Sequence, residues 1–322
     1  MEAWLTSARA EHDWLRAGSC VAQQQMIRTW DQALKHSFKV KGRGRPSFKS
    51  FHRDLPSLQY TRNGFTISDD RRLKLAKGIS IPVVWSRELP SIPSSCRVFR
   101  DAIGHWYVSF VVRRIEAVGL EVESDHAGGI GIDWGIKAIA TTTDSSFDMP
   151  HSHHGRNISA RLKKTQQKMS RRKKKRGSTP SKKYLEAKQQ TAKLYAKAAR
   201  QRKDEESKWA KNVVDNFDLI AIEDFKPKFM AKNRGLAKVA ADAAIGQAKQ
   251  ELVSRGKRAQ RNVVLVPPAY TSQTCSGCGA RAKQRLELKD RIFRCVEPEC
   301  GSVLDRDVNA ARNILARAGQ PL

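Results

Sequence analysis

The spacing of apolar residues in the first third of the chain predicts a helix followed by short strands. Between Val21 and Phe38 (VAQQQMIRTWDQALKHSF) apolar positions recur every three or four residues, as in an amphipathic helix. The stretch KVKGRGRPSFKSF that follows combines glycine, proline and basic residues, so we expect a loop there. From Leu58 to Val112, strand-like runs such as GFTIS, ISIPVVW, RVFRD and HWYVSFVV alternate with turn residues. They predict a small antiparallel barrel or sheet.

The middle of the chain alternates between strand-like and helical patterns. The stretch GGIGIDWGIKAIATTTD predicts a β-hairpin with Asp133 on its first strand. Residues 158–216 have a helical pattern, which a basic run followed by GSTP interrupts, so we expect two helices. The apolar run DLIAIE is too short for a helix and predicts a buried strand that ends at Glu223. The basic run consists of Arg171, Arg172, Lys173, Lys174, Lys175 and Arg176.

Three more elements complete the pattern. A helix is expected from Ala237 to Arg255, and the run NVVLVPP predicts a third buried strand, which its two prolines end. The periodic stretch VNAARNILARA predicts a final helix. The helix from Ala237 is expected to present small and apolar residues on one face, namely Ala240, Ala244, Ala248 and Leu252.

The charge of the chain indicates the class of partner. Its 322 residues are enough for two modest domains, and 61 Lys and Arg outnumber 32 Asp and Glu, giving a formal net charge of +29. Such an excess attracts polyphosphates, whose condensed counterions are released on binding. The sequence has neither an apolar run of about 18 residues nor a signal peptide. We therefore expect a cytoplasmic or nucleoid-associated protein that binds nucleic acid rather than a membrane. Although a basic run is often only a solvated face, in so basic a chain residues 171–176 are expected to contact phosphates.

Four cysteines near the C-terminus form two close pairs. Two residues separate the members of the first pair and four separate those of the second, with sixteen residues between the pairs. Two tight turns that each present a thiolate pair suit a tetrahedral zinc ion, whereas free or redox-active thiols are the alternative. Four protein ligands would close the coordination shell, so the zinc is expected to be structural. The ligands are Cys275, Cys278, Cys295 and Cys300.

Carboxylates form a second candidate site. Asp133 lies on the hairpin, Glu223 at the end of the buried strand, and Asp305 and Asp307 at the start of the final helix. Acids gathered at one sheet edge repel each other unless hard divalent cations are present, and two such ions can promote phosphodiester hydrolysis. Each acid alone has an ordinary explanation, such as a helix cap. Together their order predicts a ribonuclease-H-like nuclease, with the choice between Asp305 and Asp307 left open.

Several of these motifs resemble one known family. GIDWGIKAIATTTD, DLIAIEDF, VPPAYTSQTCSGCG and LDRDVNAARNIL are similar to stretches of the TnpB (OrfB) family of transposon-encoded proteins, relatives of compact type V CRISPR effectors, and the resemblance extends over residues 23–315. It implies an RNA-guided DNA endonuclease with a guide RNA, a target DNA, two catalytic Mg²⁺ ions and a structural Zn²⁺. It places the catalytic, magnesium-binding acids at Asp133, Glu223 and Asp307, because the family's third acid stands two positions before the asparagine matched by Asn309.

The resemblance also implies a domain organisation of the α/β class. Residues 1–120 would form a helical recognition and β-barrel wedge region, 121–271 a RuvC-type, ribonuclease-H-like core with a basic helical insertion, 272–303 a zinc ribbon and 304–322 the final RuvC segment and tail. Family members open with a further strand and helix, so the N-terminal region is expected to be incomplete, and Trp134 replaces a smaller aliphatic residue. Three alternatives remain: a nuclease-incompetent regulator or transposition accessory protein, a degenerate remnant, and a strand-joining transposase.

Overall fold

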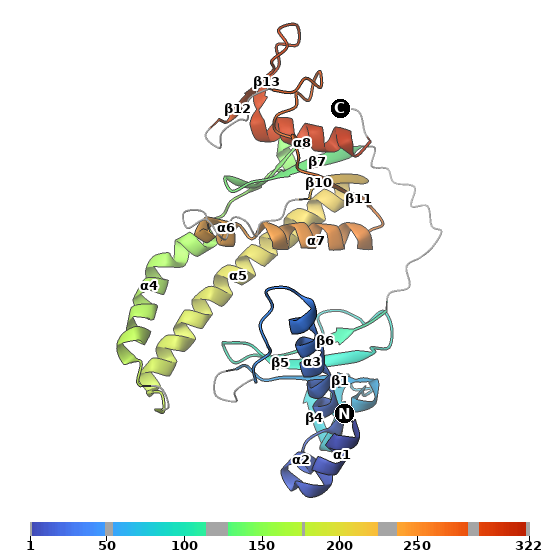
Figure 1. The fold of residues 1–322 in the computed structure, drawn as a ribbon, viewed down its shortest axis with the longest axis vertical. Coiled ribbons are helices and arrows are strands. Elements are labelled where there is room, and N and C mark those ends of the chain that lie inside the picture. The colour runs from blue at the N-terminus through green and yellow to red at the C-terminus, as the bar shows by residue number, and fades with distance from the viewer. Residues whose placement is uncertain are drawn as a thin grey trace. The chain divides into compact units, whose positions relative to one another are not determined.

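The computed structural model describes residues 2–48, 54–113, 128–175, 178–224, 237–282 and 290–319. The chain folds into two compact units, Met1–Leu120 and Glu121–Leu322, which are described separately below. Figure 1 shows the elements of both. Among the described residues, no helix combines the length and the apolar character that crossing a membrane requires.

The first unit combines helices with two antiparallel three-stranded sheets, ordered β1-β5-β6 and β2-β3-β4. The predicted amphipathic helix is confirmed as α3, and the predicted antiparallel strands are also confirmed. Side chains from both sheets, including Tyr60, Leu73 and Cys96, share one hydrophobic core. The elements are α1 (Glu2–Glu11), α2 (Asp13–Ala17), α3 (Cys20–Lys39), β1 (Ser57–Thr61), β2 (Phe65–Ile67), β3 (Arg72–Leu75), β4 (Ile79–Pro82), β5 (Ser95–Arg100) and β6 (Trp106–Val111).

The second unit is built on a five-stranded mixed sheet with the order β11-β10-β7-β8-β9. Strands β7, β10 and β11 are parallel, whereas β8 and β9 run antiparallel to their neighbours. The predicted hairpin around Asp133 is therefore confirmed. The elements are β7 (Gly129–Trp134), β8 (Ala138–Thr142), β9 (Met149–Pro150), α4 (His154–Arg172), α5 (Lys182–Asn216), β10 (Leu219–Glu223), α6 (Ala237–Ala243), α7 (Ile245–Arg258), β11 (Asn262–Val266), β12 (Ile292–Arg294), β13 (Val303–Asp305) and α8 (Arg306–Arg317).

Helices cover both faces of this sheet (Figure 1). On one face, alternate residues of β7 and β10 such as Ile132 and Ile222 pack against α5 and α7. On the other face, Ala221 and Val266 pack against Ile314 of α8. Trp134 is only 4% exposed and makes an edge-to-face contact with Trp209 of α5, at 5.9 Å between ring centroids. The bulky residue at this position is thus accommodated in the hydrophobic core.

Two predictions about this unit are wrong in detail. The single helix expected from Ala237 to Arg255 is two helices, because Ala244 adopts a left-handed conformation (φ 48°) that interrupts the helical hydrogen bonding. The strand β11 exists, but Val266 is the one buried residue within it. Among the described strands β11 pairs with β10 alone and lies at the edge of the sheet, so most of it stays accessible to solvent. The predicted break between two helices is confirmed, since α4 ends at Arg172 and α5 begins at Lys182.

Candidate metal centres

The strand register brings the first two predicted acids together. Strands β7 and β10 are parallel neighbours, and Ile132 is paired with Ile222. The next residue on each strand is Asp133 and Glu223, respectively. Paired residues of adjacent strands share one face of a sheet, and neighbouring strands lie about 4.8 Å apart. Asp133 and Glu223 therefore lie side by side at the carboxyl edge of the sheet.

A glycine allows the final helix to approach this edge closely. Gly131 lies two residues before Asp133 and thus on the same face of β7. A Cβ atom at Gly131 would lie 2.0 Å from the carbonyl oxygen of Ala311 in α8, so only glycine permits this packing. Asp307 stands one helical turn before Ala311, and its negative charge acts on Asp133. The helix α8 thus brings a third acid to the same edge.

Burial and mutual repulsion disfavour the ionised forms of two of these acids. Burial, followed by the charges of Glu223 and Asp307, raises the pKa of Asp133 well above its usual range, against the opposing effect of Arg306. Burial also raises the pKa of Glu223 to about 7, although Lys249 opposes the shift. A divalent cation would remove this penalty, because carboxylate oxygens are the ligands that hard cations prefer. The donor set therefore fits magnesium.

Basic side chains compensate part of the negative charge. The guanidinium groups of Arg291 and Arg306 lie 3.5 and 3.3 Å from the carboxylate of Asp307. The ammonium of Lys249 in α7 lies 2.6 Å from Asp224, the residue after Glu223. The oxygens of the three acids do not all converge within 4.8 Å of one another, unlike the ligand atoms of the cysteine cluster described below.

The structure gives Asp305 a different role from Asp307. Asp305 is the N-cap residue of α8, and its Oδ1 accepts hydrogen bonds from the backbone N–H groups of Asp307 at 2.8 Å and Val308 at 3.3 Å. Its carboxylate is thus engaged in starting the helix. Asp307 is the acid of this pair whose charge contributes to the raised pKa of Asp133.

The four predicted cysteines converge. The Sγ atoms of Cys275 and Cys300 are 3.8 Å apart and those of Cys278 and Cys295 are 3.4 Å apart, and all four lie within 4.8 Å of one another. Tetrahedral zinc with Zn–S bonds of about 2.3 Å requires sulfur atoms roughly 3.8 Å apart, so the cluster fits this ion. The hydroxyl and backbone N–H of Ser302 lower the pKa of Cys300 to about 6, whereas burial and the neighbouring thiols raise the pKa of Cys295 to about 12. Binding of a metal ion by all four cysteines would therefore release protons.

Local conformation explains both cysteine turns. Gly279 has a φ of +77° in the first turn, where a residue with a side chain would be strained. The backbone N–H of Gly279 donates to the carbonyl of Cys275, which closes this turn. The second pair lies in the turn between β12 and β13, in whose short sheet Phe293 is buried and paired with Leu304. The wider spacing of the second pair therefore does not prevent convergence.

Two asparagines that sequence reasoning did not select connect the cysteine cluster to α8. Asn309 is fully buried; its Oδ1 accepts from the backbone N–H of Ser276 at 2.9 Å, and its Nδ2 donates to the carbonyl of Thr274 at 2.8 Å. The Nδ2 of Asn313 donates to the carbonyls of Thr271 and Thr274, at 2.9 and 2.6 Å. Their placement on the core face of α8, four residues apart, was the signal that could have identified them.

The predicted basic run lies at the junction of α4 and α5. Arg171 and Arg172 end α4, and Lys173, Lys174 and Lys175 follow it, all five of them exposed. The guanidinium of Arg172 donates to the backbone carbonyl of Lys183 at the start of α5, at 3.2 Å. Arg176 lies outside the described residues. The five described residues therefore present their positive charge to solvent where two helices meet.

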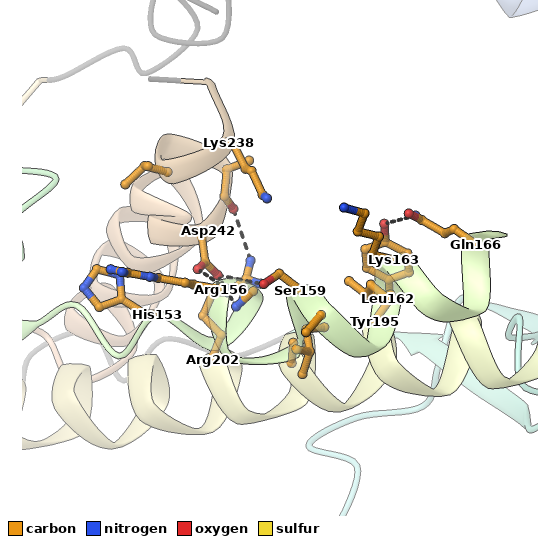
Figure 2. Close-up of a pocket in the computed structure, with 16 residues that line it drawn as sticks. His153, Arg156, Ser159, Leu162, Lys163, Gln166, Tyr195, Arg202, Lys238 and Asp242 are labelled. Carbon is orange, nitrogen blue, oxygen red and sulfur yellow. Dashed lines mark hydrogen bonds and ion pairs between the residues drawn. The ribbon is translucent and has the colours of Figure 1, made fainter. Parts of the chain in front are cut away.

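A third group of possible ligands consists of His151, His153 and Asp242. His153 and Asp242 line a pocket (Figure 2). The backbone N–H of His153 donates to Nδ1 of His151, so the proton of the neutral ring is on the other nitrogen. Asp242 already accepts backbone N–H groups of Gly155 and Arg156 and lies 3.7 Å from the guanidinium of Arg202. Because these lone pairs are engaged and a cation is already close, the group fits a metal ion poorly.

The fold and these sites define a mixed α/β protein with a three-carboxylate edge and a zinc-type cysteine cluster. Two family models match the chain: one described as "Probable transposase" (OrfB_IS605) over residues 115–234, and one described as "Cas12f1-like, TNB domain" over residues 246–314. The first range contains Asp133 and Glu223, and the second contains the four cysteines and Asp307.

Two relatives, named "Putative RNA-guided DNA endonuclease" and "Putative RNA-guided DNA endonuclease InsQ", match most of the chain. One, from Streptomyces pristinaespiralis, is 32% identical over 92% of this chain and 71% of its own length. The other, from Escherichia coli (strain K12), is 27% identical over 98% of this chain and 79% of its own length. A solved Cas12f1 chain in a complex with sgRNA and target DNA has a TM-score of 0.51 at 19% identity, covering 87% of this chain and 67% of that chain. This likeness supports the fold. The chain belongs to the TnpB (OrfB) family, because the Streptomyces pristinaespiralis relative matches nearly all of it at 32% identity.

Proposed function

We propose that this protein is an RNA-guided DNA endonuclease of a transposable element, with a guide RNA and a target DNA as its partners. The observation that carries the proposal is the gathering of Asp133, Glu223 and Asp307 at one edge of the sheet. The names of two relatives supply the partners and the substrate. The proposed place of action is the cytoplasm or nucleoid, where both nucleic acids would be met.

The domain assignment is part of the same proposal. Residues 121–271 form a RuvC-type, ribonuclease-H-like core with the α4–α5 insertion, and residues 304–322 complete it. Residues 272–303 form a zinc ribbon between the two core segments, and residues 1–120 form a recognition and wedge region. The division between the two compact units at residue 120 agrees with the first of these boundaries.

In the proposed mechanism the three acids would hold two magnesium ions. When bound, these ions supply an activated water and stabilise the leaving oxygen during phosphodiester hydrolysis. Asp133 and Glu223 would contribute carboxylate ligands from adjacent strands, and Asp307 would contribute the third carboxylate from the first turn of α8. Arg291 and Arg306 keep the carboxylate of Asp307 at the sheet edge.

The proposed zinc ion has a structural role. Four thiolates leave no open coordination position for a substrate, so the ion stabilises the fold rather than the transition state. The zinc ion would also stabilise the carboxylate edge. The side chain of Asn309, on the helix that carries Asp307, forms hydrogen bonds with the backbone of the first cysteine turn.

The decisive experiment compares single alanine substitutions in a cleavage assay with Mg²⁺, the guide RNA of the protein and a target library with varied flanking sequences. Asp133→Ala, Glu223→Ala and Asp307→Ala should each lower cleavage by roughly a thousandfold or more, and double substitutions should be no worse, because the acids act as one unit. Binding of RNA and DNA should be unchanged or stronger, since each substitution removes a negative charge.

Asp305→Ala is the matched control. It removes an acid two residues from Asp307 and costs about 1 kcal/mol of stability through the lost helix cap, but it should retain measurable cleavage. An active Asp307→Ala variant beside an inactive Asp305→Ala variant would overturn the assignment of the third acid. A wild-type protein that binds both nucleic acids but cuts no library member would instead indicate a nuclease-incompetent regulator.

A further inference from the structure

A pocket of about 1000 Å³ lies among α4, α5 and α6 (Figure 2), apart from the carboxylate edge. This volume is at the upper end of the roughly 300–1,000 Å³ found for small-molecule sites. Helix α4 contributes Leu162 and Lys163 to its lining, α5 contributes Tyr195 and Ala198, and α6 contributes Lys238 and Asp242.

The opening of the pocket carries uncompensated positive charge. Figure 2 shows Lys163 and Lys238 extending toward one another from opposite sides of the opening. Both are exposed, and neither forms an ion pair with any acid of the described part of the chain. The one acid among the lining residues, Asp242, is already engaged by two backbone N–H groups and Arg202. Two facing ammonium groups repel each other, and an anion between them would remove this repulsion.

The interior of the pocket offers apolar and aromatic surface. Leu162 and Ala198 are buried at the α4–α5 contact and form part of the lining. Tyr195 is 52% exposed, and its hydroxyl accepts a hydrogen bond from the side chain of Gln166 at 3.1 Å, which links the ring to α4. An exposed aromatic ring beside basic side chains is a combination on which nucleic-acid bases stack.

We propose that this pocket binds a nucleotide of single-stranded nucleic acid, with a backbone phosphate between Lys163 and Lys238 and the base against Leu162 and Tyr195. The pocket offers a contact for each part of the nucleotide: the two lysines for the phosphate, and the apolar and aromatic lining for the base. The base must be unpaired, since a paired base could not turn its face to the tyrosine ring. This inference rests on the nucleic-acid partners of the proposed function and does not depend on cleavage.

The test compares two double variants of equal charge. Lys163→Gln/Lys238→Gln removes the two lysines of the opening, whereas Lys164→Gln/Lys257→Gln removes two exposed lysines that do not line the pocket. Affinities for an RNA and a DNA single strand of the same sequence are measured by fluorescence anisotropy over a range of salt concentrations. The pocket variant should bind at least about tenfold more weakly than the wild type, and the slope of its log affinity against log salt concentration should be smaller by roughly one. For the control variant both changes should be less than half as large.

A third variant tests the base contact. Tyr195→Ala should weaken binding by about fivefold or more, whereas Tyr195→Phe, which keeps the ring, should bind like the wild type. A loss confined to RNA assigns the pocket to the guide, and a loss confined to DNA assigns it to a target strand. Equal losses of affinity in the two double variants would contradict binding at the pocket, because the loss would then come from the lower overall charge. A wild-type protein that binds neither strand would overturn the proposed partners as well.

Discussion

Glu206 shows how burial of a single carboxyl links stability to pH. It lies in α5 with 2% of its surface exposed, and its Oε1 has no hydrogen-bond partner within the described part of the chain. Burial, assisted by the charge of Glu251, raises the pKa of Glu206 to about 7 against the opposing effect of Arg202. Because the folded state binds this proton more tightly than the unfolded state, the free energy of unfolding should fall as pH rises from about 4.5 through 7.

Glu206→Gln should remove this dependence. The neutral amide avoids the cost of a buried charge, so the variant should be more stable than the wild type at pH 8 by roughly 1–3 kcal/mol and about equal to it at pH 4.5. Urea unfolding at both pH values measures the difference. Glu186→Gln, an exposed change on the same helix, should alter stability by less than about 0.5 kcal/mol. A gain at pH 8 that persists unchanged at pH 4.5 would contradict burial as the cause.

At the scale of elements, α8 joins the two candidate metal centres. Its first turn carries Asp307, and the next residues toward its core face are Asn309 and Asn313, which hold the backbone of the first cysteine turn. A change in the cysteine cluster should therefore reach the carboxylate edge, because the same rigid helix contacts both.

Asn309→Ala should test this connection. It leaves the N–H of Ser276 without its buried partner and removes one of the two hydrogen bonds to the carbonyl of Thr274, which should cost about 1–3 kcal/mol. Zinc content, measured by elemental analysis, should stay near one ion per chain while cleavage falls; Cys275→Ser should lose both zinc and cleavage. Asn216→Ala, whose side chain makes exposed hydrogen bonds within α5, serves as the control. Unchanged cleavage by Asn309→Ala would show that the two centres are independent.

The elements differ in how far the sequence alone could define them. Apolar runs and turn residues were sufficient to place β7, β8 and β10, because each pattern is local. The break at Ala244 was not predictable, since alanine favours a continuous helix and only tertiary packing forces its positive φ. The edge position of β11 likewise depends on strand order, which a buried-looking apolar run does not contain.

The candidate sites also differ in how far the sequence alone could predict them. The cysteine spacing was sufficient to predict the zinc-type cluster. The separation of Asp305 from Asp307 was not accessible from the residues, because both acids precede the same helix and only the cap hydrogen bonds distinguish them. Two assignments stay predictions: the catalytic role of Asp133, Glu223 and Asp307, and the phosphate binding by the basic run.

At the scale of the whole molecule, the net charge of +29 should dominate binding. Affinity for nucleic acid should fall by orders of magnitude between about 50 and 200 mM salt, because each phosphate contact releases counterions. The run at the α4–α5 junction, whose residues 171–175 are exposed, is the densest part of this charge in the sequence. Replacing all six residues, Arg171 to Arg176, with glutamine should weaken binding to every sequence by a similar factor and reduce the salt slope.

A charge-conserving variant separates charge from base recognition. Exchanging each arginine of the run for lysine and each lysine for arginine keeps the charge but changes the geometry of every hydrogen-bonding group. If residues 171–176 contact phosphates, this variant should bind a randomised pool of single strands with nearly the affinity and the salt slope of the wild type. Sequencing the bound fraction provides the second measurement. A changed sequence preference in either variant would mean that the run reads bases, since phosphate contacts are the same at every nucleotide.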